Sequence, residues 1–192
     1  MSPRSQIQNE KIRSESTGKI LEAAFRLMVK DGYESTSISQ IAKEAGVSKG
    51  LMYNYFRSKE ELLNALIKKT IRDGEKIMGN IYSENPAVTL ENVFRWFFNE
   101  LRNNLSEWRF VSEIMLKADK YPFVKEIITI KMSEYMKFIS DLLTKLGFKN
   151  PESEAYIIGG LMDGIGFACL VVGEEYPIDE MEKYIIDKYC KN

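Results

Sequence analysis

Apolar positions recur at helical spacing along most of the chain. They return every three or four residues, which is the period of a helix with one buried face. No segment alternates apolar and polar residues in the manner of a half-buried strand. The pattern predicts an all-α fold of about nine helices, with a three-helix head followed by a larger helical body. The predicted helices cover residues 19–30, 37–45, 48–56, 58–81, 90–105, 108–118, 122–146, 152–173 and 178–189.

The segment 36–61 carries two helix-start signals around a glycine. Ser37 and Ser58 are each followed three residues later by Gln or Glu, which is the spacing of a capping box. Gly46 fits a turn with a positive φ, and Ala42 is small enough for two helices to cross closely. This arrangement predicts a helix-turn-helix, a motif whose second helix enters the major groove of DNA.

The second helix of this motif has a solvent face that starts at its first residues. Ser48, Lys49, Gly50 and Leu51 offer a hydroxyl, a cation, a gap and an apolar tip to base edges. Glycine inside a helix costs about 1 kcal/mol relative to alanine, so Gly50 favours close approach to another surface. The alternative interpretation is that Gly50 is merely tolerated at a helix start.

Three residues beyond these suit phosphate oxygens. Tyr53, Tyr55 and Lys59 lie near the end of the short helix and the start of the next one, where hydroxyls, an ammonium and backbone N–H groups meet. Such contacts position a protein on DNA without reading its sequence. Tyr53 fits equally well as a half-buried core aromatic with its hydroxyl at the rim.

Composition narrows the function further. The chain of 192 residues contains no histidine, which removes Ser-His-Asp triads, Cys-His dyads and histidine zinc sites. Residues 1–70 hold 12 Lys/Arg against 8 Asp/Glu, while residues 71–192 hold 15 against 20. This asymmetry favours a protein that approaches a polyanion with one end. The two cysteines predict no disulfide framework, and a reducing, cytoplasmic location is expected.

Four motifs follow one another in the first third of the chain. They are Ile41-Ala42, Ala45-Gly46-Val47-Ser48-Lys49-Gly50, Met52-Tyr53-Asn54-Tyr55-Phe56 and Ser58-Lys59-Glu60-Glu61-Leu62-Leu63. Through these motifs residues 18–71 resemble the N-terminal domain of the tetracycline-repressor-like (TetR/AcrR) transcriptional regulators. The resemblance implies a bacterial homodimer that binds a double-stranded DNA operator, acts most often as a repressor and is released by a small apolar or aromatic effector. It adds Ser37 and Ser39 to the expected DNA contacts.

The predicted organisation has three parts. Residues 1–15 are polar and mildly basic, so we expect a flexible arm and no signal peptide. Residues 16–71 form the helix-turn-helix DNA-binding domain. Residues 72–192 form the effector-binding and dimerisation domain, and the helix 58–81 links the two.

The body is rich in aromatic residues at helical spacing, which most often means core packing. The functional alternative is a cavity between body helices that holds the effector. The candidate lining residues are Phe97, Leu101, Phe110, Tyr135, Phe138, Met162, Asp163 and Phe167.

Residues 155–173 are apolar enough to suggest a membrane span. Asp163 near the middle argues against insertion, and no membrane partner is expected. The small residues four apart in this segment favour a helix that packs closely on a second copy. Asp163 itself would line the pocket or pair across the interface. The predicted interface consists of Gly160, Gly164 and Ala168 with Met181, Ile185 and Tyr189 from the last helix.

Two other classes of function stay open. An all-helical enzyme would use Asp163, Tyr135 or Tyr156, yet no nucleophile and base stand at credible spacing. A ligand carrier would use the head only as a structural cap. We expect no enzyme activity, no cofactor and no metal site. The effector, the operator, the regulated genes and the choice between repression and activation are not encoded in a readable pattern.

Overall fold

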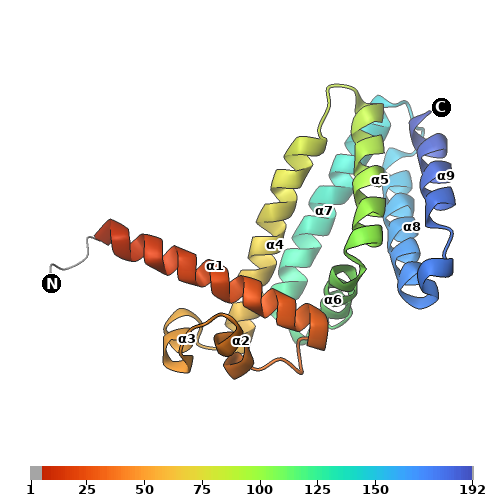
Figure 1. Ribbon diagram of the computed structural model, residues 1–192. Helices are drawn as coiled ribbons and strands as arrows, with labels where there is room; N and C mark the ends of the chain where they lie inside the picture. Colours follow the sequence, from red (N-terminus) through yellow and green to blue (C-terminus); the bar gives the residue numbers. More distant parts are fainter. Residues whose placement is uncertain (1–5, 192) are drawn as a thin grey trace. The chain divides into compact units, whose positions relative to one another are not determined.

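The computed structural model describes residues 6–191, and the regular secondary structure within them is all helix, without a strand (Figure 1). The expectation of an all-α fold with about nine helices is confirmed. Two short 3-10 turns, η1 (Ala118–Lys120) and η2 (Gly173–Glu175), interrupt the series. The helices are α1 (Gln6–Asp31), α2 (Ile38–Glu44), α3 (Lys49–Tyr55), α4 (Lys59–Ile81), α5 (Pro86–Asn103), α6 (Leu105–Leu116), α7 (Pro122–Lys145), α8 (Pro151–Val172) and α9 (Ile178–Cys190).

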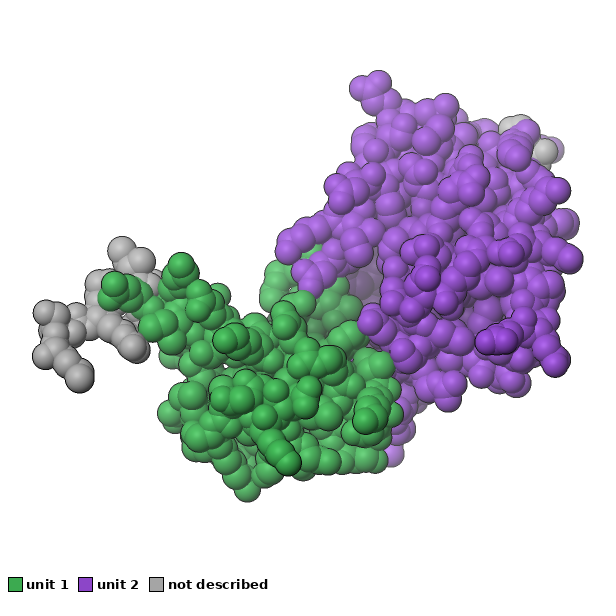
Figure 2. Space-filling view, in the orientation of Figure 1, with its two compact units in different colours: residues 1–72 green, residues 73–192 purple. Residues whose placement is uncertain are grey.

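The chain divides into two compact units, Met1–Arg72 and Asp73–Asn192 (Figure 2). The division falls inside α4, one residue from the boundary expected at 71/72. Unit 1 therefore contains α1, α2, α3 and the first part of α4, and unit 2 contains the rest.

Unit 1 is built around the crossing of its short helices with α1 and the start of α4. Ile41 of α2 and Met52 of α3 are fully buried, and Ala42 is 2% exposed. Ser37 forms the predicted capping box, because its Oγ accepts the Gln40 N–H at 3.2 Å while the Gln40 side chain accepts the Ser37 N–H at 2.8 Å. These contacts fix where α2 begins and which face it buries.

The N-terminal arm differs from the expectation. Residues 1–5 lie outside the described part, but residues 6–15 are the first turns of α1 rather than a flexible arm. Between Gln6 and Thr17 the sequence contains no glycine and no proline, and half of its residues are Gln, Glu, Lys or Arg, which have good helix propensity. Toward the N-terminus, α1 therefore continues beyond the buried residue Ile20, because no residue in this stretch ends a helix.

Unit 2 is a bundle in which α5, α7, α8 and α9 run alongside one another (Figure 1). Phe94 and Phe98 of α5, Leu143 of α7 and Ile158 of α8 are at most 1% exposed, so each helix contributes one face to a single core. Arg102 of α5 is paired with Asp179 at 2.6 Å and with Glu182, which joins the outer edge of α5 to α9.

Two helix boundaries in unit 2 differ from those predicted. Helix α5 begins at Pro86 instead of residue 90, and α6 occupies 105–116 instead of 108–118. The Asn85 side chain accepts the Ala87 N–H at 2.9 Å, and Pro86 occupies the first turn, where its missing N–H costs nothing. A cap five residues before the expected start at residue 90 therefore sets the start of α5.

Helix α8 is apolar along most of its length. By length and a mean hydropathy of 1.9, the segment Pro151–Glu175 could cross a membrane, and 33% of that apolar window is buried within the chain. Its buried side, which includes Met162, Ile165 and Cys169, packs in the core of unit 2. A core helix of this kind meets the same criteria of length and hydropathy as a membrane span.

Replacing Gly46 with alanine should destabilise unit 1. Gly46 has a φ of +68°, where a residue with a Cβ costs roughly 1–2 kcal/mol. The Gly46→Ala substitution should therefore lower the free energy of unfolding by about that amount. Urea denaturation followed by circular dichroism measures the loss. Gly50→Ala is the matched control: a Cβ there meets no atom within 4 Å, so the same assay should show no loss.

Candidate nucleic-acid interface and effector site

The turn between α2 and α3 closes through two backbone hydrogen bonds. The Gly46 N–H donates to the Lys43 carbonyl at 3.2 Å, and the Val47 N–H donates to the Ala42 carbonyl at 2.9 Å. This pair of bonds is the Schellman ending, which requires the left-handed conformation that Gly46 adopts. The turn fixes where α3 starts and leaves one side of it in solvent.

Helix α3 is held by one buried residue and one cap. Met52 is fully buried, and Ser48 Oγ accepts the Leu51 N–H at 3.1 Å. The opposite face is exposed: Lys49 and Gly50 are in solvent, and Leu51 is 39% exposed. These four predicted DNA contacts therefore lie together on the outer side of one short helix.

Gly50 has open space in front of it. A Cβ at this position would meet no atom within 4 Å, so nothing in the chain itself requires glycine there. A glycine that internal packing does not require is consistent with close approach of another molecule. The structure thus removes internal crowding as the reason for this residue.

The other predicted DNA contacts differ in their exposure and in their partners within the chain. Tyr53 is 46% exposed, which favours the surface interpretation over a core aromatic, and Ser39 is exposed. Ser37 is exposed too, but its hydroxyl donates to Gln40 Oε1 at 2.7 Å as part of the cap. Tyr55 is half-buried, with the Arg13 guanidinium 5.8 Å from its ring centroid.

Lys59 makes contacts within the chain rather than projecting outward. Its Nζ donates to the Tyr33 carbonyl at 2.9 Å and to the Glu34 carbonyl at 3.1 Å, and lies 4.4 Å from the Tyr33 ring centroid. Burial, with Glu34 and Glu60 adding to it, raises the pKa of Tyr33 to about 12, so its ring stays neutral. Lys59 therefore ties the start of α4 to the loop after α1.

The start of α4 is also less suited to phosphate than the sequence suggested. Glu60 and Glu61 occupy its first turn, and Glu61 Oε2 accepts the Arg57 N–H at 2.7 Å. The Ser58 hydroxyl accepts the Glu61 N–H at 3.0 Å. Carboxylates thus already complement the positive end of this helix.

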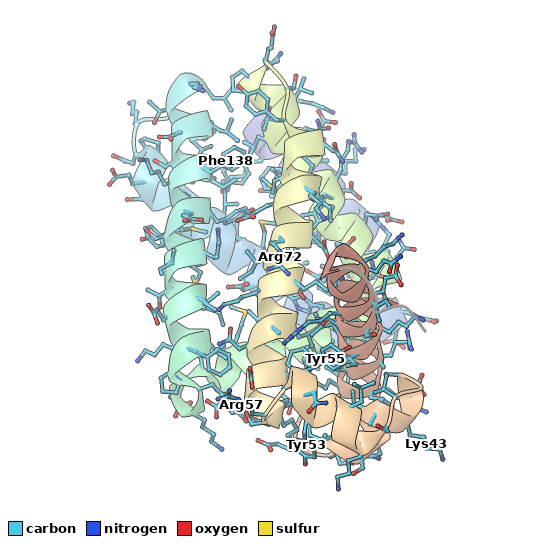
Figure 3. The ribbon with its side chains drawn as sticks, turned by 90° about the vertical axis from the view of Figure 1, so that its left-hand side faces the viewer. Lys43, Tyr53, Tyr55, Arg57, Arg72 and Phe138 are labelled. Atoms are coloured by element: carbon cyan, nitrogen blue, oxygen red, sulfur yellow. The ribbon has the colours of Figure 1, made fainter. Side chains whose placement is uncertain are left out.

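Two exposed cations of unit 1 were absent from the predicted interface. Lys43 lies in the last turn of α2, directly after the buried pair Ile41-Ala42, and Arg57 lies between α3 and α4. Figure 3 shows Lys43 at the same edge of unit 1 as Tyr53 of α3. Helical spacing from the buried pair would have placed Lys43 outward, but motif matching alone does not single it out.

The candidate effector residues fall into three groups by burial. Phe97, Leu101, Phe110 and Met162 are buried at 2–7% exposure. Tyr135 and Phe138 are partly buried and pack against the same core, and Figure 3 labels Phe138 on α7. Asp163 and Phe167 are exposed on the flank of α8.

Two surface hollows of unit 2 lie elsewhere. One of about 320 Å³ lies between α7 and α8, where Lys137 and Asp141 face Glu152 and Tyr156. The other, of about 260 Å³, lies between α5 and α9 beside Arg95 and Glu182. Both are lined mainly by charged and polar side chains, and neither includes any of the eight candidate effector residues.

The predicted interface residues separate in the same way. Gly160 and Gly164 are exposed on α8, and a Cβ at either would meet nothing within 4 Å. Ile185 and Tyr189, in contrast, are 6% and 2% exposed because they pack within the core of their own unit. The stripe on α9 that was expected to face a second copy is therefore the inward face of that helix.

Met181 and Ala168 are intermediate cases. Met181 is partly buried against the core, and Ala168 is half-buried beside the exposed small residues of α8. The residues that extend the exposed face of α8 are apolar, namely Ile157, Leu161, Phe167, Val171 and Val172.

The helix-turn-helix lies within a segment that matches a known family. Residues 20–66 match the family described as bacterial regulatory proteins, tetR family. The chain belongs to the tetR family of bacterial regulatory proteins. This is a family of transcriptional regulators and not of enzymes.

Similarity to a curated relative extends beyond the helix-turn-helix. The chain is 31% identical over 160 residues to YuxN, an uncharacterized HTH-type transcriptional regulator of Bacillus subtilis (strain 168). That match covers 80% of the chain but 54% of YuxN, so the chain spans about half the length of this relative.

Solved structures share the fold of both units. A TetR transcription regulator from Haloarcula marismortui ATCC 43049 superposes with a TM-score of 0.82 at 16% identity, covering 93% of this chain and 97% of that one. AibR, solved in complex with isovaleryl coenzyme A and operator DNA, gives a TM-score of 0.70 at 18% identity, covering 91% and 98%. At these identities the likeness establishes the tetR-family fold alone.

Lys59→Met should destabilise this tetR-family head. The substitution removes two charge-assisted hydrogen bonds to backbone carbonyls, so the free energy of unfolding should fall by about 1–3 kcal/mol in urea denaturation. Lys68→Met, at an exposed position of the same helix, is the control and should change stability little. Equal stability of the two variants would contradict the structural role of Lys59.

Proposed function

We propose that the chain is a ligand-responsive, sequence-specific DNA-binding transcriptional regulator that acts as a homodimer. In this proposal it is a cytoplasmic bacterial repressor that a small-molecule effector releases from its operator. The observation that carries the proposal is the exposed face of α3, where Lys49 and Tyr53 are exposed and a Cβ at Gly50 would meet no atom within 4 Å. Membership of the tetR family supports the same conclusion.

The chemistry of that face fits a DNA groove. Lys49 can reach a guanine edge or a phosphate, and Leu51 can contact a thymine methyl group. Gly50 would let the backbone of α3 approach the bases, since it places no side chain between them. Tyr53 and Lys43 at the same edge would contact phosphates, which orient a protein on the duplex without specifying sequence.

Charge supports the assignment of this role to unit 1. Residues 1–72 hold 13 Lys/Arg against 8 Asp/Glu, whereas residues 73–192 hold 14 against 20. Duplex DNA therefore attracts the first unit and repels the second. An acidic second unit fits the proposal that this unit binds the effector and the second copy of the chain and not the DNA.

The exposed face of α8 supports the homodimer. Ile157, Leu161 and Val171 are 51%, 42% and 84% exposed. Leu161 and Val171 follow Ile157 by 4 and 14 residues, so all three lie on the side of the helix where Gly160 and Gly164 leave room. An uncovered apolar face of this kind marks an interaction surface. A second copy of α8 would cover it, since the two glycines allow helix backbones to approach closely.

A second copy explains this face better than a lipid bilayer does. The opposite side of α8 is part of the core of unit 2, so insertion would require that core to be dismantled. Asp163 lies near the middle of the helix, where a carboxylate is costly in lipid. We therefore place no membrane among the partners.

Dimerisation matters for DNA binding because of geometry. Two copies of α3 must enter successive major grooves about 34–36 Å apart to bind one operator. An effector that binds unit 2 more tightly in another arrangement of the dimer would lower the population with that spacing. AibR is described with both an acyl coenzyme A and operator DNA, which illustrates such a pair of partners in the same fold.

Lys49→Ala should weaken DNA binding and its salt dependence together. An operator can be isolated from a random duplex pool by repeated retention on the wild-type protein. If Lys49 neutralises one phosphate, the slope of log affinity against log salt should fall in magnitude by about one, and if it reads a base, sequence preference should relax. Fluorescence anisotropy over a salt series measures both.

The control for that experiment is Lys145→Ala, an exposed cation of unit 2. It removes the same charge from the chain but should leave affinity and slope unchanged. Failure of the wild-type protein to enrich any sequence from the pool would overturn the proposed function.

Leu161→Glu should separate the dimer. A carboxylate on the exposed face of α8 would be buried against its symmetry mate without a cation, so the dimer should dissociate and operator affinity should fall. Sedimentation velocity gives the oligomeric state. Tyr82→Glu, at a residue 62% exposed outside this face, should leave the dimer intact, and a dimer that survives Leu161→Glu would refute the assigned interface.

A further inference from the structure

The indole of Trp108 lies directly on the backbone of α8 at Gly166. A Cβ at Gly166 would come within 2.4 Å of Trp108 Cε2 and Nε1, so only glycine leaves room for the ring. The Phe97 ring meets the indole edge-on, with 5.5 Å between ring centroids and 79° between planes. Gly166 thus forms a flat slot in unit 2, and the side chain of Trp108 fills it.

The indole N–H has no partner in this slot. Trp108 Nε1 is buried and donates to no atom of the described residues. Buried polar groups in folded proteins are nearly always hydrogen-bonded, and each exception calls for a reason. The ring is held by apolar contact alone, and its N–H would gain a partner by leaving.

A second poorly satisfied donor lies one helical turn away. The Tyr135 hydroxyl donates to Met162 Sδ at 3.7 Å, and a thioether sulfur is a weak acceptor. Met162 and Gly166 are four residues apart, so both lie on the same face of α8. Burial and the neighbouring charge of Asp163 raise the pKa of Tyr135, which keeps its hydroxyl protonated and able to donate.

Helix α6, which carries Trp108, is weakly anchored at both ends. No side chain caps its N-terminus, and its last turn exposes Met115 and Leu116, the latter at 72%. Neighbouring α5 is capped by the Asn85 side chain. Helix α8 also lacks a side-chain cap, but α5 and α8 each begin with a proline in the first turn and bury a longer face than α6. Movement of α6 would therefore cost less than movement of the helices that it covers.

We propose that the effector binds on this inward face of α8 by displacing the Trp108 indole from Gly166. The ligand class is a neutral, flat, apolar molecule that carries a hydrogen-bond acceptor for the Tyr135 hydroxyl. The slot sets the shape, because it already accepts a bicyclic ring. The regulatory meaning of the site rests on the proposed function, whereas ligand binding at the site does not.

The charges around the site select against anions. Asp163 follows Met162 directly, and no basic side chain of the described residues forms an ion pair with it. Glu107 precedes Trp108, and burial together with Glu100 raises its pKa, which reports an acidic, partly desolvated neighbourhood. A negatively charged ligand would add to this repulsion, so the acceptor should be a neutral oxygen such as a carbonyl.

Three bicyclic probes test the proposal by calorimetry on the full chain. Coumarin is neutral with a carbonyl acceptor, naphthalene lacks an acceptor, and 1-naphthoate is an anion. Coumarin should bind Trp108→Ala at least about tenfold more tightly than wild type, because no ring has to leave first. Adding Tyr135→Phe should cost coumarin about tenfold and naphthalene nothing, since only coumarin accepts the hydroxyl. The anion should bind more weakly than coumarin.

A second variant tests the displacement without any probe. Gly166→Ala should push the indole out of the slot, and in a Trp96→Phe background Trp108 is the single tryptophan of the chain. Its fluorescence should move to longer wavelength and become more accessible to acrylamide. Gly79→Ala, where a Cβ meets nothing within 4 Å, should leave both signals unchanged. If Trp108→Ala fails to fold, Trp108→Phe takes its place in the calorimetry.

The outcomes separate the two proposals. Equal coumarin affinity in wild type and Trp108→Ala, or an equal effect of Tyr135→Phe on coumarin and naphthalene, overturns the site. Unchanged quenching in Gly166→Ala does the same. If the probe pattern holds but the wild-type protein retains no DNA, the site stands and the regulator fails. Where DNA is retained, Gly166→Ala should also bind the selected operator at least about tenfold more weakly, as a mimic of the bound state.

Discussion

The left-handed turn at Gly46 is the constraint on which the DNA-facing unit depends. It ends α2 through paired hydrogen bonds to the Ala42 and Lys43 carbonyls, and it sets where α3 starts. Because the turn fixes this start, Met52 alone suffices to bury the inner side of α3. The outer side of α3 is then not needed to hold the helix in place. The recognition role proposed for this seven-residue helix fits such an arrangement, because a turn, and not a long packed face, fixes where the helix starts.

Glycines in α8 serve two opposite purposes, and the structure separates them. Gly159 and Gly166 lie against side chains of neighbouring helices, since a Cβ would come within 3.0 Å of Met136 at the first and 2.4 Å of Trp108 at the second. Gly160 and Gly164 face open space. Packing against the rigid indole requires glycine at Gly166, and Gly159 lies close to the flexible end of Met136, whereas the second pair has no such explanation. Composition alone would treat all four as one small-residue stripe.

Local chemistry in the sequence was sufficient to predict much of the fold. The serine caps, the glycine at residue 46 and the prolines at 122 and 151 mark helix boundaries that the structure reproduces, because each acts through its own backbone neighbours. The sequence was less informative about residues whose contacts depend on distant partners. Lys59 was interpreted as a phosphate ligand, but its partners are carbonyls about 25 residues earlier in the chain.

The last helix illustrates the same limit. Ile185 and Tyr189 form a clean apolar stripe, and a stripe indicates that a face is buried without indicating against what. Here the partner is the core of the same unit. The candidate effector residues were also chosen for their apolar character, and most of them pack into that core. Trp108, which the spacing argument passed over, is distinguished only by a neighbouring glycine and an unpaired N–H, neither of which a sequence pattern reveals.

Helix α8 brings the two proposed sites of unit 2 onto one rigid element. Its inward face carries Met162 and Gly166 beneath Tyr135 and Trp108, and its outward face carries the apolar strip around Gly164. A helix moves as a unit because its backbone hydrogen bonds resist bending. A ligand that replaces the indole on the inner face cannot reproduce its contacts in full, so α8 must shift or rotate to accommodate the difference. The same displacement would appear on the outer face, where glycines leave little side chain to absorb it. Coupling between effector binding and dimer geometry then needs no chain of intermediate residues, because the effector and the second copy of the chain contact opposite sides of one helix.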